Sequence, residues 1–259
     1  MGKIIAVANQ KGGVGKTTTA VNLAACLAAD QHNTLLIDMD PQANATSGCG
    51  ASTNSLTRSV YEILLGQIDL ADAVFPTILP FLHLVPSHIN LAGAEMEMAS
   101  IPGREKKLAT ALGAARQEYD YILIDCPPSL GLLTVNALCA ADSVLVPLQC
   151  EYYALEGLGL LLNSVHRVRR YLKPELDIEG VLMTMYDERL QLSRRVAAEA
   201  RSYFGDKVYN TVIKRNISLA EAPGHGRPVI LYDALSIGAE NYTDLAAEVG
   251  QGSRVALAS

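Results

Sequence analysis

The sequence predicts an α/β fold, a doubly wound and mostly parallel sheet with helices on both faces. Two observations carry this prediction. Short, nearly continuous runs of β-branched and apolar residues recur along the chain, as expected for parallel strands that are covered on both faces. Between these runs lie stretches with small and apolar residues at helical spacing, and repeated β–α alternation is typical of a parallel sheet.

The expected strands begin close to the N-terminus and continue through most of the chain. They are KIIAVA (3–8), TLLID (34–38), LHLVP (82–86), YILID (121–125), SVLVP (143–147), IEGVLMT (178–184) and VYNTVI (208–213). Helices are expected at GKTTTAVNLAACLAA (15–29), EGLGLLLNSVHRVRRYL (156–172) and SRRVAAEARSYF (193–204).

One stretch, residues 44–80, falls outside the alternation. It is polar and then loosely helical, and we expect it to form an excursion on the carboxyl edge of the sheet. The chain contains no low-complexity linker and no internal repeat, so residues 1–259 are predicted to form a single domain.

Composition excludes several classes of protein. Hydrophobic residues make up 49% of the 259 residues and charged residues 19%, which favours a buried core over disorder. There is no apolar run long enough for a transmembrane helix, and the N-terminus becomes polar too early for a signal peptide, so a cytoplasmic protein is expected. The five cysteines show no C-x-x-C spacing and are interpreted as reduced thiols.

Charge is unevenly distributed along the chain. The formal net charge of −6 argues against a nucleic-acid-binding protein. However, residues 161–215 contain 11 Lys and Arg against 7 Asp and Glu, a local balance of +4. Taken alone, this excess favours solvated helix faces over a binding surface.

A phosphate-binding loop is predicted at NQKGGVGKTT (9–18), directly after the first strand and at the start of the first helix. The usual pattern G-x-x-x-x-G-K-[ST] would place a glycine at Gln10, which is followed by a second lysine, Lys11. The loop glycines allow the backbone N–H groups to turn inward beside the positive end of the helix dipole. Lys16 can reach the β- and γ-phosphates, and the Thr17 hydroxyl can ligate Mg²⁺. A glycine turn without a ligand would not explain Lys-Thr-Thr at the helix start.

Three aspartates follow predicted strands at the same edge of the sheet. Asp125 ends YILID, where a Walker B aspartate holds Mg²⁺ through water. Asp38 and Asp40 lie two residues apart, so both side chains can face one site. Ligand sites of open α/β sheets lie at the carboxyl ends of the strands. Three such residues beside a phosphate loop favour a shared site over three separate helix caps.

These motifs resemble those of a known family. KGGVGKTT is similar to the deviant Walker A motif of the ParA/MinD class of P-loop ATPases. Within that class, LLIDMDPQANATSG, YILIDCPPSLGLLTVNAL, PLQCEYYALEGL and RNISLAEAPGHGRPVILYD resemble the ParA/Soj branch, which partitions bacterial chromosomes and plasmids. The resemblance runs nearly from end to end and implies a single P-loop ATPase domain.

The resemblance implies a role for the second lysine. In this family the residue that matches Lys11 reaches across a dimer interface to the phosphates of the partner's nucleotide, so two ATP molecules are held between two subunits. A lysine donated in this way supplies positive charge where the transition state spreads negative charge over the phosphate oxygens. Lys11, Lys16 and Asp40 are therefore the expected catalytic residues, with Asp40 positioning the attacking water.

The resemblance also implies the remaining nucleotide and metal contacts. ATP and Mg²⁺ are the expected cofactors. Mg²⁺ is expected near Thr17, Asp38 and Asp125, and adenine near Asn216, although Lys214 replaces a proline that is usual in the family. The expected nucleotide contacts are Lys11, Gly12, Gly13, Val14, Gly15, Lys16, Thr17, Thr18 and Asn216.

DNA binding is expected from the basic region. Dimers of the Soj kind bind double-stranded DNA without sequence preference, and Arg189 matches one of the arginines that they use. Arg215 and Lys214 are the other expected contacts, because Ser218 replaces a second family arginine. Arg194 or Arg195 is a further candidate to compensate for that replacement. The expected partners are therefore a second copy of the chain, non-specific DNA at the nucleoid, and a ParB-like centromere-binding protein that stimulates hydrolysis.

Three alternatives fit the sequence to different degrees. A membrane-associated positioning ATPase of the MinD kind would end in a basic amphipathic helix, whereas this chain ends NYTDLAAEVGQGSRVALAS, and no membrane partner is expected. A redox iron protein would need cluster cysteines, and neither Cys126 nor Cys139 lies in suitable surroundings. A P-loop ligase or synthetase with a small-molecule substrate is not excluded.

Overall fold

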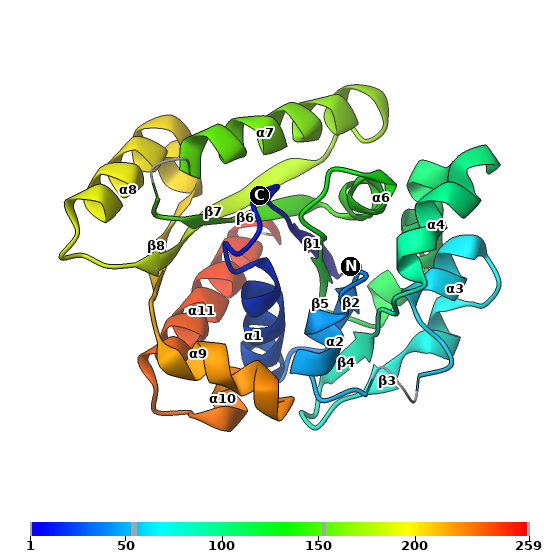
Figure 1. Cartoon of the computed structure of the whole chain (residues 1–259), viewed down its shortest axis with the longest axis horizontal. Coiled ribbons are helices and arrows are strands. Elements are labelled where there is room, and N and C mark those ends of the chain that lie inside the picture. Colours follow the sequence, from blue (N-terminus) through cyan, green and yellow to red (C-terminus); the bar gives the residue numbers. More distant parts are fainter. Residues whose placement is uncertain (1, 53–55, 152–153, 258–259) are drawn as a thin grey trace.

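The strands form one eight-stranded sheet in the order β3-β4-β2-β5-β1-β6-β7-β8 (Figure 1). The computed structural model describes residues 2–52, 56–151 and 154–257. Neighbouring strands pair in parallel, except that β3 pairs antiparallel with β4. The strands are β1 (Lys3–Val7), β2 (Thr34–Asp38), β3 (Phe75–Pro76), β4 (Leu82–Val85), β5 (Tyr121–Asp125), β6 (Ser143–Gln149), β7 (Asp177–Tyr186) and β8 (Val208–Lys214).

The predicted strands are all present, and their boundaries differ from the predicted ones by at most two residues. Among the strands of the described residues, β3 alone was not predicted, because it is two residues long and therefore shows no periodicity. It lies at the edge of the sheet, where a proline such as Pro76 costs no hydrogen bond of the ladder.

Helices cover both faces of the sheet, because alternate residues of each strand point to opposite sides. Ile5 and Val7 of β1 pack on the face that carries α1 and α11, whereas Ile4 and Ala6 pack on the face that carries α6, α7 and α8 (Figure 1). The first face also carries α2 (Asn44–Gly48), α9 (Ile217–Glu221) and α10 (Val229–Tyr232), beside α1 (Lys16–Ala29) and α11 (Ile237–Leu257). The second face carries α3 (Val60–Leu65), α4 (Leu91–Glu97), α5 (Lys107–Ala111), α6 (Leu132–Ala140), α7 (Ala154–Tyr171) and α8 (Gln191–Phe204).

The expectation for residues 44–80 is only partly correct. Its first part, α2, stays at the carboxyl edge, where the N–H of Thr46 donates to Asp38 at the end of β2. The rest is the crossover that joins β2 to its parallel neighbour β4, and α3 buries Val60, Ile63 and Leu64 against the sheet. A parallel pair needs a connection of this kind, which returns the chain to the opposite edge.

The central strands bring their ends together at the carboxyl edge. In the register of the sheet, Asp125 at the end of β5 lies beside Val7 of β1 on one side and Asp38 of β2 on the other. The loop after β1 therefore begins next to two buried aspartates. Among the described residues, no helix combines the length and the apolar character that crossing a bilayer would require.

Candidate functional site

The loop between β1 and α1 has the backbone that its glycines predict. Gly13 has a φ of 74° and Gly15 a φ of 89°, both in the left-handed region that glycine adopts without a steric penalty. Gly15 precedes the first residue of α1, and no side chain caps the first turn of this helix. The N–H groups of that turn are thus available to an anion.

The two lysines of the loop point to different partners. Lys16 is buried, and its Nζ donates to the backbone carbonyl of Lys11 at 3.0 Å. Burial lowers the pKa of Lys16, and the carboxylate of Asp125 opposes this shift. The Nζ of Lys11 instead lies 2.7 Å from Oε2 of Glu151, on a partly exposed side chain. Lys16 therefore faces the interior of the loop, whereas Lys11 reaches toward the end of β6.

Asp38 and Asp125 are fully buried neighbours, as their adjacent strand ends predict. Burial raises the pKa of Asp38 to about 6, although the hydroxyl and N–H of Thr46 and the N–H of Asp40 donate to it and oppose the shift. Burial and the nearby Asp38 raise the pKa of Asp125 well above its usual value, and Thr17 and Lys16 oppose this shift. When no cation is bound, a larger fraction of both carboxyls is therefore protonated at a given pH than of exposed aspartates.

The two carboxylates differ in the hydrogen bonds that they already accept. Both oxygens of Asp38 accept hydrogen bonds from within the α2 region. Both oxygens of Asp125 are buried and lack a hydrogen-bond partner. A buried, unsatisfied carboxylate near the Thr17 hydroxyl fits a hard cation such as Mg²⁺. Among the described residues, no cluster of three His, Cys, Asp or Glu side chains could hold a metal.

Asp40 lies just beyond β2 and is also buried. Its Oδ1 accepts from the N–H of Gln42 at 2.9 Å, which fixes the turn before α2. Its charge acts on both Lys16 and Asp125, so the three groups share one environment. The structure thus brings together Lys16, Thr17, Asp38, Asp40 and Asp125, while their chemical roles stay predictions.

Three neighbours that sequence reasoning missed hold the loop in place. The Thr184 hydroxyl, at the end of β7, donates to the carbonyl of Val14 at 2.8 Å. Asn9 accepts from the N–H of Lys11, and its side-chain amide donates to the carbonyl of Pro147 in β6. Glu151, which pairs with Lys11, was missed as well. Only Asn9 gives a signal in the sequence, as a polar residue between a buried strand and the glycines. Tyr152 and Tyr153, within PLQCEYYALEGL, lie outside the described residues.

The residue predicted to contact adenine lies at the start of α9. The Oδ1 of Asn216 accepts from the N–H of Leu219 at 3.2 Å and caps this short helix. The amide nitrogen of Asn216 carries two N–H donors, a group that could donate to a base. Asn216 lies two residues after the end of β8, at the same edge of the sheet as the loop.

The predicted DNA contacts gather around the ends of β7 and β8. The guanidinium of Arg189 is 85% exposed and forms a bidentate ion pair with Asp187, whose pKa it lowers to about 2. Arg215 also acts on Asp187, and Lys214 is the register partner of Tyr186. The structure therefore places the three basic residues near one another. The hydroxyl of Ser218, which is half-buried, donates to Oδ2 of Asp233.

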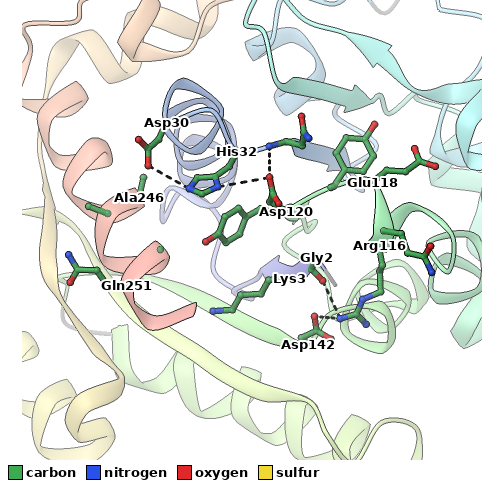
Figure 2. A pocket seen from close by; sticks show the side chains of 16 residues that line it. Gly2, Lys3, Asp30, His32, Arg116, Glu118, Asp120, Asp142, Ala246 and Gln251 are labelled. Atoms are coloured by element: carbon green, nitrogen blue, oxygen red, sulfur yellow. Dashed lines mark hydrogen bonds and ion pairs between the residues drawn. The ribbon is translucent and has the colours of Figure 1, made fainter. Parts of the chain in front are cut away.

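A cavity of about 1010 Å³ opens at the opposite edge of the sheet (Figure 2). Its charged side chains pair largely with one another, since His32 lies between Asp30 and Asp120, and Arg116 pairs with Asp142 (Figure 2). None of its lining residues belongs to the predicted site. The predicted nucleotide site and this cavity are therefore separate features at opposite edges of the sheet.

Comparisons with known proteins agree with this geometry. A family model described as an AAA domain matches residues 2–178. The sporulation initiation inhibitor protein Soj of Bacillus subtilis is 57% identical over 96% of this chain and 98% of its own length. The chromosome partitioning protein ParA of Myxococcus xanthus is 51% identical over 96% of this chain and 88% of its own.

A solved structure shares the whole fold. Cobyrinic acid a,c-diamide synthase from Mycobacterium smegmatis, with bound ADP and magnesium, matches with a TM-score of 0.86 and 36% identity, over 98% of this chain and 96% of that protein. The α/β fold predicted from the sequence is confirmed by this match and by the sheet itself. This chain is a P-loop ATPase and belongs to the ParA/Soj family of chromosome-partitioning proteins.

Proposed function

We propose that this chain is an ATP-dependent partitioning ATPase whose nucleotide-bound form is a sandwich homodimer that binds double-stranded DNA without sequence preference. Hydrolysis, stimulated by a ParB-like partner, would release the DNA and so drive the segregation of a chromosome or plasmid. The main support for the proposal is that the side chains of the two loop lysines point to different partners. Lys16 lies inside the loop, and Lys11 reaches outward from it.

The residues around the loop suit the binding of ATP. The open first turn of α1 and the glycine backbone supply N–H donors for the phosphates, and Lys16 is buried at their base. Asp125 and Thr17 would hold Mg²⁺, as the unsatisfied carboxylate suggests. When bound, the ion would neutralise charge that develops on the phosphate oxygens. The relative from Mycobacterium smegmatis, which carries ADP and magnesium, supports this part of the proposal.

Hydrolysis is an in-line attack of water on the γ-phosphate. Asp40 is held by the N–H of Gln42 on one oxygen, so its other oxygen can orient a water molecule. Lys11 from the second subunit would add positive charge as the transition state forms, the role that an arginine has in other P-loop enzymes. Asp38 would support the Mg²⁺ shell from its place beside Asp125, and its hydrogen bonds fix the backbone of Asp40 and α2.

DNA binding would depend on dimerisation. One subunit offers Arg189, Lys214 and Arg215, a small set of phosphate contacts near the carboxyl edge. Two subunits joined at that edge double the set, and affinity rises steeply with the number of neutralised phosphates. Such a protein would work in the cytoplasm, at the nucleoid. We also propose that residues 1–259 act as one ATPase domain.

The alternatives have less support. The curated relatives at 57% and 51% identity are named for sporulation inhibition and chromosome partitioning, whereas the match to the diamide synthase is 36%.

One experiment separates the partitioning function from a synthetase function. ATP turnover is measured alone, with DNA, with a ParB-like partner, and with both. Joint stimulation by DNA and the partner is the expected result. Turnover that ignores both and responds only to a small-molecule acid and an amine donor would favour the synthetase.

A further inference from the structure

The Lys11–Glu151 ion pair has no part in the hydrolysis mechanism proposed above. Lys11 Nζ lies 2.7 Å from Glu151 Oε2, with 31% of the lysine side chain and 48% of the glutamate side chain exposed. The other oxygen of Glu151 accepts from the side-chain amide of Gln149, at the end of β6. The carboxylate is therefore held on one side by its own strand and holds Lys11 on the other.

The backbone of Lys11 is fixed independently of its side chain. Its N–H donates to Asn9, and Asn9 in turn donates to the carbonyl of Pro147 in β6. Its carbonyl accepts from Lys16 Nζ. The root of the Lys11 side chain is thus tied to β6, next to the strand end that presents Glu151. This arrangement follows from the parallel pairing of β1 with β6, which brings both segments to the same edge.

We propose that Glu151 is a positioning residue that holds Lys11 within its own subunit until nucleotide-driven dimerisation transfers the amine to the partner's phosphates. The inference rests on the proposed function, because it assumes that Lys11 acts across the interface. In the subunit without nucleotide, the carboxylate neutralises the amine and directs it away from Lys16. A triphosphate on the partner carries more negative charge than one carboxylate, so it can compete for the amine.

The strength of the contact suits such an exchange. Both side chains are partly exposed, and ion pairs of this kind contribute little and are screened by salt. A contact of this strength biases the position of Lys11 without blocking its release. A symmetric dimer contains two subunits, and the Lys11–Glu151 pair must break in each of them when the dimer forms. The dimer dissociation constant therefore reflects the free energy of two ion pairs.

The first arm of the test examines the ion pair in the nucleotide-free protein. The rate at which an amine-acylating reagent modifies Lys11 is measured by mass spectrometry in the wild type and in Glu151→Gln. Faster modification in Glu151→Gln is expected, because the amine loses its carboxylate partner. An unchanged rate would overturn the inference, whatever the dimer does.

The second arm measures the dimer dissociation constant by sedimentation velocity, in the presence of ATP, for Asp40→Ala and for the double variant Asp40→Ala/Glu151→Gln. The Glu151→Gln change should tighten the dimer by roughly 2- to 30-fold at low salt, the range expected for two exposed ion pairs. This difference should shrink at high salt, which a purely structural role would not produce. Unchanged or weaker dimerisation would overturn the inference.

The matched control is Asp177→Asn. Asp177 pairs with Lys207 at 2.8 Å, is similarly exposed, and begins β7 at the opposite edge of the sheet. This change also removes one negative charge, so an equal tightening of the dimer would show a general charge effect and overturn the inference. Failure of the proposed function would give a different result. In that case neither Asp40→Ala nor Asp40→Ala/Glu151→Gln would dimerise with ATP, although the rate of Lys11 modification would still respond to Glu151→Gln.

Discussion

The buried pair Asp38 and Asp125 makes the stability of the nucleotide-free protein depend on pH. Asp38 has a pKa of about 6 in the folded chain, against an ordinary value of 3.8. A group whose pKa is raised on folding contributes stability below its unfolded pKa and loses it as the pH rises through the folded pKa. The gap of about two pKa units corresponds to about 3 kcal/mol in full, of which about 2 kcal/mol is lost between pH 4.5 and pH 8. Asp125 acts in the same direction.

The perturbation that isolates this effect is Asp125→Asn. The amide keeps the shape of the side chain and removes a buried charge that has no hydrogen-bond partner. Urea unfolding of nucleotide-free protein should show a gain of about 1–3 kcal/mol at pH 8 and a smaller loss of stability between pH 4.5 and pH 8 than in the wild type. Stability that is flat or rises over this pH range in the wild type, or an Asp125→Asn protein that is less stable at pH 8, would show that the two buried carboxyls do not cause the pH dependence.

The other predictions concern nucleotide and DNA. Lys16→Ala should lose ATP binding, because it removes the charge at the base of the loop, and calorimetry that finds an affinity within about threefold of the wild type would contradict this. Asp40→Ala should bind ATP but not release phosphate, and normal turnover in a phosphate-release assay would remove Asp40 from the catalytic role. Thr184→Val leaves the carbonyl of Val14 without its donor and should weaken ATP binding by about 1–3 kcal/mol, whereas unchanged affinity would show that the loop does not need this contact. Arg189→Ala should weaken DNA binding equally on all sequences, while ATP-driven dimerisation is kept. It should also reduce the slope of log affinity against log salt by about 1–2. A salt titration with an unchanged slope would place the DNA surface elsewhere.

Much of the fold and the core of the site follow from local patterns. Apolar runs such as TLLID and YILID specify strands that are buried on both faces, and their final aspartates meet because parallel strands end at one edge. Likewise, the glycines and Lys16 mark the phosphate loop through chemistry that is contained in ten consecutive residues. These features were predictable because each depends on near neighbours and on one rule for sheets.

The contacts that complete the site are not local. Glu151 is 140 residues from Lys11 in the chain, and Thr184 is 170 residues from Val14. Each pair meets only because β6 and β7 lie on the same side of β1 in the strand order. The hydrogen bonds that Asp38 accepts from Thr46 were not predictable either, because the turn into α2 that supplies the donors has no regular period.

If ATP joins two subunits through a lysine that each gives to the other, the molar mass of the Asp40→Ala protein should depend on both the nucleotide and Lys11. Light scattering after gel filtration is run with ATP, with ADP and without nucleotide, and is repeated with Lys11→Ala added. A dimer is expected only with ATP, and the protein that also carries Lys11→Ala should be a monomer that still binds ATP. An ATP-dependent dimer that survives Lys11→Ala would mean that the second lysine serves its own nucleotide.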